Sequence, residues 1–356
     1  MTSSVLKEIL IRRMEATGPI TLAEFMAECL MHPQHGYYQK ERVFGKDGDF
    51  ITAPEVSQMF GEIIGLYLAD RWYKMGKPES FHLIEFGPGR GTLMADILRA
   101  TTPVEGFADA AEVHFIETSL QLRALQKKKV PNGQWHDTLN TVPDGPSLII
   151  GNEFFDALPI HQYERQNGKW LERRVHTENG AFQLVVTEPT AHVALIPEHM
   201  KQGPDGSIAE ICPSALSIMG DISLRLNTHG GSALFLDYGY RTSSFGDTFQ
   251  ALKNHEYVDP FAEPGAADLT AHVAFDQLHR AATEAHAKAY GSTPQGMFLM
   301  TLGIGNRAQA LAAGSDPAKQ EKILSELKRL TAPDEMGILF KVLAVQNHEL
   351  PPPPGF

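Results

Sequence analysis

The chain has few cysteines and no long apolar segment, and both absences narrow what it can be. Its two cysteines, Cys29 and Cys212, lie far apart, and neither belongs to a C-x-x-C pair. A disulfide framework or a cysteine-based zinc site is therefore not expected, and a reducing compartment fits. Nowhere do about 18 apolar residues follow one another, so no membrane span is predicted. The first residues also lack the apolar block of a signal peptide.

Positive charge is scarce as well. The formal net charge of -12 argues against a nucleic-acid partner, since such proteins are usually basic. Among 15 histidines, His32 and His35 are spaced H-x-x-H, but no third ligand stands at a convincing spacing, so no metal is expected. Neither a G-x-S-x-G turn nor a Walker loop occurs, which leaves hydrolase and NTPase functions without support.

What the chain does contain is typical of a globular α/β protein. Hydrophobic residues make up 42% of its 356 residues, enough for one large domain or two. Residues 1–75 have apolar residues at helical spacing, and Thr21–Glu24 and Thr52–Glu55 each match a capping box at a helix start. From residue 81 onward, short apolar runs alternate with helical patterns, which predicts a parallel sheet covered by helices on both faces.

The expected elements of this core are strands at 81–87, 113–117, 147–155 and 233–239, helices at 92–100 and 119–129, and a terminal strand at 337–346. Two Asn-Gly pairs at 167–168 and 179–180 separate alternating runs and predict a three-stranded antiparallel insert. We therefore expect an N-terminal helical extension with a cofactor-covering loop (1–75), the first part of the core (76–162), the β insert (163–205), and the second part of the core with substrate-side helices (206–356).

The sharpest motif is a glycine-rich turn between an expected strand and helix. Glu85 stands two residues before glycines at 87, 89 and 91, and Pro88 lies among them. Glycines let the backbone bend tightly and approach a ligand, and the helix start beyond them suits a carboxylate. A dinucleotide fingerprint would be G-x-G-x-x-G, but position 92 is Thr, which argues against a nicotinamide-dependent oxidoreductase. The E-x-G-x-G-x-G form resembles the first motif of class I methyltransferases.

Acidic residues follow the next expected strands. Glu117 closes the second strand, where a carboxylate can accept hydrogen bonds from both ribose hydroxyls, although a helix start at Ser119 explains it too. Asp137 stands where it can face an adenine amine, and a plain turn role fits it equally. The resemblance to the methyltransferase motif implies two roles. The glycine turn is expected to hold the methionine part of the cofactor, and Glu85 to fix the turn or the amino group of the cofactor; the turn residues are Gly87, Pro88, Gly89 and Gly91.

The segment after the third strand reads GNEFFDALP, with Asn152, Glu153 and Asp156 beside two phenylalanines. Two carboxylates and aromatic faces suit a guanidinium, which carboxylates pair with bidentately and aromatic rings stack on. Methyl transfer needs an aligned nitrogen and excluded water, and the carboxylates would localise the guanidinium charge on its remote nitrogens. Capping of the following turn is the other role open to Glu153 and Asp156.

Over most of its length the sequence resembles the MidA-like S-adenosylmethionine-dependent methyltransferases, a family that includes a mitochondrial complex I assembly factor that methylates an arginine. The most specific segments are GDFITAPE, NEFFDALP and DLTAHV; the full set is 32–38, 48–62, 85–98, 152–164, 234–240, 268–278, 295–304 and 336–345. The resemblance implies a class I methyltransferase fold, S-adenosyl-L-methionine as cofactor, and symmetric dimethylation of a protein arginine, with a complex I subunit or similar protein as partner.

The resemblance adds further candidates. It implies that the loop with Asp49 covers the cofactor, and that Asp237 and Tyr238 line the cleft, where Tyr238 can equally pack inside. Asp268 and His272 are candidates for the acceptor site, but an N-cap role for Asp268 and a buried, satisfied His272 stay open. Familiar arginine methyltransferases use two glutamates where this loop offers Glu153 and Asp156.

Two points remain alternatives. A non-catalytic assembly chaperone that binds S-adenosylmethionine structurally is the second functional hypothesis, although the glycine turn is intact. The chain begins close to the family's first helix, so we expect a cytoplasmic bacterial protein, or a mitochondrial matrix protein if the source is eukaryotic. The sequence leaves the oligomeric state open, with a homodimer as the commonest symmetric assembly.

Overall fold

The structure, a computed structural model, describes residues 5–39 and 52–356. The chain forms two compact units, and each has its own hydrophobic core. The first unit comprises residues 1–50, 155–217 and 242–273, and the second comprises 51–154, 218–241 and 274–356. Residues 206–217 and 242–273, which the sequence assigned to the second part of the core, thus belong to the first unit. The domain boundaries expected from the sequence stay predictions.

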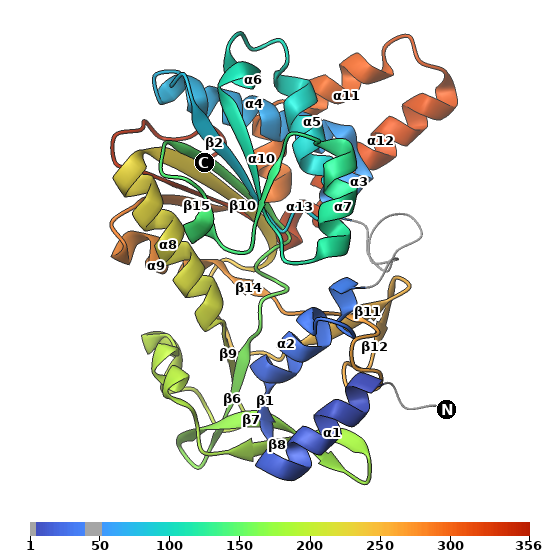
Figure 1. Ribbon diagram of the computed structural model, residues 1–356, viewed down its shortest axis with the longest axis vertical. Coiled ribbons are helices and arrows are strands. Elements are labelled where there is room, and N and C mark those ends of the chain that lie inside the picture. Colours follow the sequence, from blue (N-terminus) through green and yellow to red (C-terminus); the bar gives the residue numbers. More distant parts are fainter. Residues whose placement is uncertain (1–4, 40–51) are drawn as a thin grey trace. The chain divides into compact units, whose positions relative to one another are not determined.

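The first unit is built on an antiparallel sheet (Figure 1). Its strands run in the order β1-β7-β6-β9, and β8 pairs with β7. Their bounds are β1 Ile20–Thr21, β6 His161–Gln166, β7 Lys169–Glu178, β8 Ala181–Thr187 and β9 Ile208–Ile211. The hairpin turns lie at Asn167-Gly168 and Asn179-Gly180, as the sequence predicts, because both asparagines adopt the left-handed backbone that such turns need. The insert is larger than expected, since β1 and β9 extend the three predicted strands.

The helices α1 (Val5–Thr17) and α2 (Leu22–Met31) belong to the same unit. Thr21 begins α2 with the predicted capping box: its hydroxyl accepts from the amide of Glu24, whose carboxylate accepts from the amide of Thr21. A second sheet has the strand order β12-β11-β13. The remaining elements are η1 Tyr37–Gln39, η3 Ala191–Leu195, η4 Glu198–Met200, β11 Gln250–Lys253, β12 Glu256–Val258 and β13 Asp268–Thr270.

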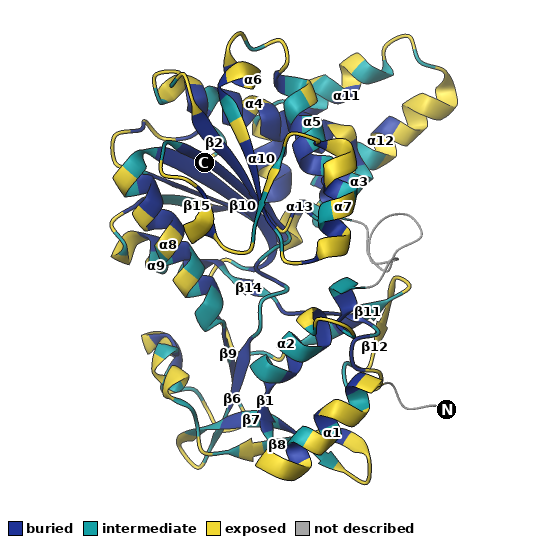
Figure 2. Ribbon diagram, in the orientation of Figure 1, coloured by how far each residue is buried: buried dark blue, intermediate teal, exposed yellow. Residues whose placement is uncertain are grey.

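The second unit contains a sheet in the order β15-β16-β10-β5-β2-β3-β4. The strands are β2 Phe81–Phe86, β3 Ala111–Ile116, β4 Gln134–His136, β5 Ser147–Asn152, β10 Gly231–Tyr240, β15 Lys288–Pro294 and β16 Phe340–Gln346. β4, β3, β2, β5 and β10 are parallel neighbours, and most of their residues are buried (Figure 2). The chain leaves β2 toward β3 and then returns to its other side with β5, so the strand order reverses between β2 and β5. Such a reversal is where α/β sheets bind ligands.

The prediction of a wholly parallel sheet is wrong at one edge. β16 is antiparallel to both β10 and β15, because the chain returns after β15 through α10 (Gln295–Thr301), α11 (Ile304–Ala312), α12 (Pro317–Thr331) and α13 (Met336–Leu339) and inserts β16 between the two. The terminal strand also begins at Phe340, since the preceding residues 336–339 are helical. β4 at 134–136 is a strand that the sequence analysis missed.

The other helices are α3 Ala53–Val56, α4 Gln58–Lys74, α5 Thr92–Thr101, α6 Phe107–Ala110, α7 Leu120–Lys129, η2 Leu139–Thr141, α8 Pro213–His229 and α9 Phe275–Glu284, with a short β14 at Val273–Ala274. α4 packs on α5, and two glycines of α4 permit the close approach. A Cβ at Gly61 would lie 2.5 Å from the Cβ of Asp96, and one at Gly65 would lie 3.2 Å from a backbone oxygen of α5.

The second predicted capping box is wrong. Thr52 precedes α3 without a side-chain hydrogen bond to it, and Ser57 instead caps α4 by accepting from the amide of Met59. Glu55, the expected partner of Thr52, accepts from the hydroxyl of Thr92. No described helix is long and apolar enough to traverse a lipid bilayer.

Candidate active site

The glycine-rich turn joins β2 to α5 in the second unit. Its three glycines have φ values of 58°, 50° and 73°, a left-handed backbone that glycine adopts at no steric cost. The amide of Gly91 donates to the carbonyl of Pro88 at 2.7 Å and closes the turn. A Cβ at Gly87 would lie 3.1 Å from the ring of Phe154, and one at Gly91 would lie 3.3 Å from Gln126. The sequence therefore needs glycine here for both conformation and space.

Glu85 is the acidic residue of the motif, and it is almost fully buried at the end of β2. Burial raises its pKa to about 8, and Glu117 adds to the rise, while Lys129 and the amide of Met94 oppose it. Among the described residues, its Oε2 atom has no hydrogen-bond partner. A buried carboxylate oxygen of this kind is costly unless a ligand satisfies it.

Gln126, which the sequence analysis did not single out, holds the turn from α7. Its Nε2 atom donates to the carbonyl of Gly89 at 2.8 Å and to Oε2 of Glu117 at 3.2 Å. Its Oε1 atom accepts from the indole of Trp135 at 2.8 Å. The only sequence signal was that it is one of two glutamines in a helix rich in lysine and leucine. This fully buried amide links the turn to the ends of β3 and β4.

The carboxyl ends of β2, β3 and β4 lie level with one another. Phe86 pairs in register with Ile116, and Ile116 pairs with His136, so the three strands end at adjacent positions. Gly87, Glu117 and Asp137 are the next residues of these strands. The structure thus aligns the glycine turn and the two predicted acidic residues along one edge of the sheet.

Glu117 and Asp137 differ in how they are held. Glu117 accepts from the amide of Ser119 at 2.8 Å and from Gln126, and burial raises its pKa. Asp137 is exposed and forms an ion pair with Arg123. Arg123 also donates to the backbone carbonyl of Glu117. Glu117 is therefore the better fixed acceptor for a ligand hydroxyl.

Glu153 follows β5, the strand on the other side of β2. Its Oε1 atom accepts from the amide of Ala53 at 3.0 Å and from Nδ2 of Asn152 at 2.8 Å. The Oε1 atom thus accepts the first amide of α3, 100 positions away in the chain. The φ of Glu153, 53°, lies in the left-handed region, which is uncommon for residues other than glycine and costs energy. Strain of this kind gathers at functional sites.

Asp237 lies in β10, next to the end of β5, and is buried. Its carboxylate accepts from the amides of Phe154 at 3.1 Å and Tyr238 at 2.9 Å. Tyr238 is also buried and packs its ring at 5.4 Å from Phe340. Phe154 in turn contacts Phe86, with ring centroids 5.1 Å apart. Asp237 thus fixes the backbone that follows Glu153.

The first unit brings together two more predicted residues, Asp156 and Asp268. Both are buried, and both lie near Tyr38, whose hydroxyl donates to Asp268 at 3.1 Å. Burial, followed by Asp268 and Asp156, raises the pKa of Tyr38. The N-cap role considered for Asp268 is wrong, because the residue lies in β13, paired with Leu252 of β11. The backbone oxygen of Asp156 accepts from Ala271, which follows β13.

His272 and the carboxylate of Glu210 are linked through Thr248. The hydroxyl of Thr248 accepts from the amide of His272 at 2.9 Å and donates to Glu210, which also accepts from the Thr248 amide. Burial raises the pKa of Glu210. His272 is half-buried. Asp49, the predicted cofactor-covering residue, lies outside the described residues.

Comparison with known proteins assigns the chain to a family. Residues 63–293 match the profile of a family described as "Putative S-adenosyl-L-methionine-dependent methyltransferase". The chain belongs to this family. It is also 38% identical over 364 residues to the Drosophila melanogaster protein named protein arginine methyltransferase NDUFAF7 homolog, mitochondrial, covering 93% of this chain and 82% of that one. Identity to the human protein of that name is 34%, covering 96% of this chain and 83% of the relative.

Solved structures show the same fold. A Burkholderia thailandensis protein described as a "likely methyl transferase", bound to S-adenosyl-homocysteine, matches with a TM-score of 0.84 and 26% identity. The match covers 98% of this chain and 93% of that chain. A second crystal structure from the same organism matches with a TM-score of 0.81 and 26% identity over the same shares of both chains. The predicted Rossmann-like methyltransferase fold is confirmed.

The chain is therefore an S-adenosylmethionine-dependent methyltransferase, and S-adenosylmethionine is its cofactor. The residues of the second unit fit this cofactor. The glycine turn offers backbone without side chains, and a Cβ at Gly87 or Gly91 would press against Phe154 or Gln126. The buried oxygen of Glu85 suits an ammonium group, and the fixed carboxylate of Glu117 suits a pair of hydroxyls.

Proposed function

We propose that the enzyme is a protein arginine N-methyltransferase. Two supports are independent of each other. The full-length relatives in fly and human carry that activity in their names. The observation that carries the proposal is the carboxylate of Glu153, which is fixed on a strained backbone directly after β5, the strand adjacent to the glycine turn's own β2. A guanidinium is the acceptor that a fixed carboxylate recognises best.

Glu153 would act on the acceptor by orientation. A guanidinium has a pKa above about 12 and stays charged, so it is a poor nucleophile. Hydrogen bonds to Glu153 would hold the charge on the remote nitrogens and leave the attacking nitrogen positioned. Asn152 donates to Oε1 of Glu153 and is its positioning residue, and Asp237 positions the backbone at Phe154. S-adenosylmethionine supplies the methyl group.

We assign the cofactor to the edge formed by the ends of β2, β3 and β4. The amides and open backbone of the turn would hold its carboxylate, and Glu85 would hold its amino group. Glu117 would accept from the ribose hydroxyls, as acidic residues do in related folds. Asp137, although exposed and paired with Arg123, stands level with Glu117 and is assigned to the adenine amine. The turn residues are Gly87, Pro88, Gly89 and Gly91, and Asp49 is kept as a covering residue.

In the first unit, Asp156 and Asp268 are assigned to the acceptor protein. Asp268 accepts from the Tyr38 hydroxyl and Asp156 also acts on the pKa of that tyrosine, so negative charge gathers here, which suits a cationic side chain. Asp156 is proposed as the second catalytic carboxylate, and His272 as a further acceptor contact. Tyr238, whose ring is buried against Phe340 within the second unit, is kept as a separate candidate for contact with the substrate.

By family resemblance we further propose symmetric dimethylation, with a respiratory complex I subunit or a similar protein as acceptor. The curated relatives are named as mitochondrial proteins. We accordingly propose a mitochondrial matrix location if the source is eukaryotic, and a cytoplasmic one if it is bacterial. A homodimer and the absence of a nucleic-acid partner complete the proposal.

The test is transfer of a labelled methyl group. The purified enzyme and labelled S-adenosylmethionine are added to an extract of cells that lack the gene, and labelled protein is hydrolysed to amino acids. The proposal expects the label in symmetric dimethylarginine and its loss with Glu153→Gln. Label in lysine or histidine, or in no residue although the enzyme binds the cofactor, would refute an arginine acceptor. The matched control is Glu164→Gln, a carboxylate on β6 outside the proposed site.

A further inference from the structure

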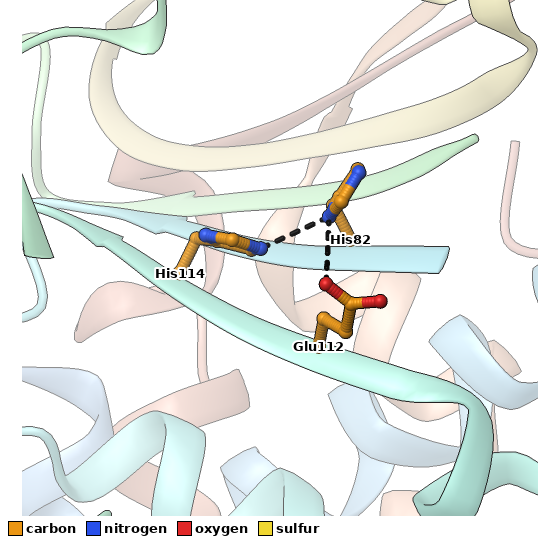
Figure 3. Close-up of side chains that lie close together, drawn as sticks. All are labelled: His82, Glu112 and His114. Atoms are coloured by element: carbon orange, nitrogen blue, oxygen red, sulfur yellow. Dashed lines mark hydrogen bonds and ion pairs between the residues drawn. The ribbon is translucent and has the colours of Figure 1, made fainter. Parts of the chain in front are cut away.

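Three side chains gather at the amino ends of β2 and β3, far along the strands from the glycine turn. His82 pairs in register with Glu112, and His114 follows two residues later, so all three lie on one face of the sheet. Figure 3 shows His82 joined by dashed lines to both His114 and Glu112. Nδ1 of His82 lies 2.9 Å from Nε2 of His114 and 3.8 Å from Oε2 of Glu112. One ligand atom from each residue lies within 4.8 Å of the others.

From this cluster we propose a new site for a divalent transition-metal ion of the zinc type, with His82, Glu112 and His114 as ligands. Two imidazoles and one carboxylate are a ligand set that zinc uses, with a fourth position left to water. At a Zn–N bond of about 2.0–2.1 Å and tetrahedral geometry, two nitrogens would lie about 3.4 Å apart. The observed 2.9 Å needs the rings to separate by only a few tenths of an ångström.

The remaining ring nitrogens already have the partners that a metal-bound histidine requires. Ligating histidines normally donate their second N–H to a carbonyl or another fixed acceptor. Nε2 of His82 lies 3.4 Å from the carbonyl oxygen of Asp144. Nδ1 of His114 lies 2.9 Å from Nε2 of His136, whose Nδ1 lies 2.9 Å from the hydroxyl of Thr141. Each potential ligand is therefore oriented from behind.

The hydrogen bonds along His82, His114 and His136 can run in either of two directions, depending on which ring nitrogens carry the protons. In the first, Thr141 donates to His136, which donates to His114, which donates to His82, and His82 donates to the carbonyl of Asp144. In the second, His114 donates to His136 and His136 donates to Thr141, whose hydroxyl donates to the carbonyl of Thr138 at 3.0 Å. The second direction leaves Nε2 of His114 and Nδ1 of His82 both as lone pairs. Two nitrogen lone pairs that face each other can both be donated to one cation.

The surroundings also fix the rings and leave a path to solvent. A Cβ at position 145 would lie 2.8 Å from Nε2 of His82, so Gly145 provides the space for that ring. Ser80 donates to Oε1 of Glu112 at 2.7 Å and leaves Oε2 facing His82. Both histidines are buried, whereas the side chain of Glu112 is 49% exposed. An ion could enter past this carboxylate.

The positive charge of Arg225 lies nearby and would disfavour a bound cation. The guanidinium of Arg225 donates to Ser147 and to the carbonyls of Val142 and Pro143. The carboxylate of Glu112, 3.8 Å from Nδ1 of His82, supplies the negative charge that would compensate an incoming cation.

The test uses the full chain after removal of metal by a chelator. Zn²⁺ is titrated calorimetrically, and Co²⁺ is titrated to follow the visible absorption of a tetrahedral site. We expect one ion per chain and a rise of the melting temperature with Zn²⁺. Glu112→Gln should weaken binding about tenfold or more. The control Glu79→Gln removes the same charge from an exposed residue close to the start of β2, and should change affinity less than about twofold.

His114→Gln removes a nitrogen ligand and serves as the second variant. Its fold is checked by circular dichroism and by binding of S-adenosyl-homocysteine, since the glycine turn is at the other end of β2. Loss of the cobalt spectrum in a folded variant supports the site. Failure of the native chain to bind either ion, or binding that both variants leave unchanged, would overturn it. Neither result depends on whether the acceptor is arginine.

Discussion

Replacing Glu85 by glutamine should stabilise the fold at neutral and alkaline pH, although it alters the proposed cofactor site. Burial raises the pKa of Glu85 from 4.5 to about 8. Between these values the folded chain holds a proton that the unfolded chain has lost, so the free energy of unfolding falls by about 1.4 kcal/mol per pH unit as pH rises. The accumulated cost is about 3 kcal/mol at pH 7 and about 5 kcal/mol above pH 8. Glutamine carries no such cost.

The assay is urea unfolding of the native chain and of Glu85→Gln between pH 5 and 9. The two free energies of unfolding should nearly agree at pH 5 and diverge steadily up to pH 8, with the variant more stable. The control Glu79→Gln, at an exposed position, should follow the native chain. Equal pH slopes for native chain and Glu85→Gln, or a variant that is less stable at pH 8, would show that burial of this carboxylate is not costly.

The raised pKa of Glu85 also leads to a prediction about ligand binding. If Glu85 holds the ammonium group of the cofactor, the ligand lowers the pKa of Glu85, and binding near pH 7 releases a proton. Calorimetry of S-adenosyl-homocysteine in two buffers with different heats of ionisation should detect this release in the native chain. Glu85→Gln should show weaker binding without the release. A native chain that releases no proton would contradict this role.

Three further variants test the turn and the acceptor side. Gly87→Ala forces an L-residue to a φ of 58° and a Cβ to within 3.1 Å of Phe154, so we expect a loss of about 1–2 kcal/mol in stability and weaker S-adenosyl-homocysteine binding by calorimetry. Glu153→Gln should lower kcat about 100-fold or more while leaving cofactor affinity within about threefold, and a large affinity loss would contradict an acceptor role. Gln126→Leu should cost about 2–4 kcal/mol in urea unfolding because Gly89 loses its buried donor, and an unchanged stability would argue against Gln126 as a support of the turn.

The parts of the fold that follow from local patterns could be predicted from the sequence. The apolar run ending at Glu85 marked β2, the Asn-Gly pairs marked the hairpins, and Thr21 with Glu24 marked the start of α2. What could not be predicted depends on distant partners. The antiparallel direction of β16 is set by where the chain returns, and the run of residues 337–339 has no local signal that divides helix from strand.

The candidate site divides in the same way. The glycine turn and the acidic residues at the ends of β2 and β3 lie close together in the sequence or directly after apolar runs, so they could be predicted from it. Gln126 acts through three partners outside its own helix, at separations of 9, 9 and 37 positions, and a glutamine in a helix is usually exposed. Asp268 precedes a helical pattern and suggested an N-cap, but pairing with β11 places it in a strand. The cluster of His82, Glu112 and His114 depends on strand register, which the sequence does not state.

The most direct test of the account is a crystal structure of the chain with S-adenosyl-homocysteine. The account predicts the amino-acid end of the ligand against the backbone of residues 87–91, with its amino group at Glu85 and its ribose hydroxyls at Glu117. A ligand bound elsewhere, or a turn at 87–91 that makes no contact with it, would contradict the central claim.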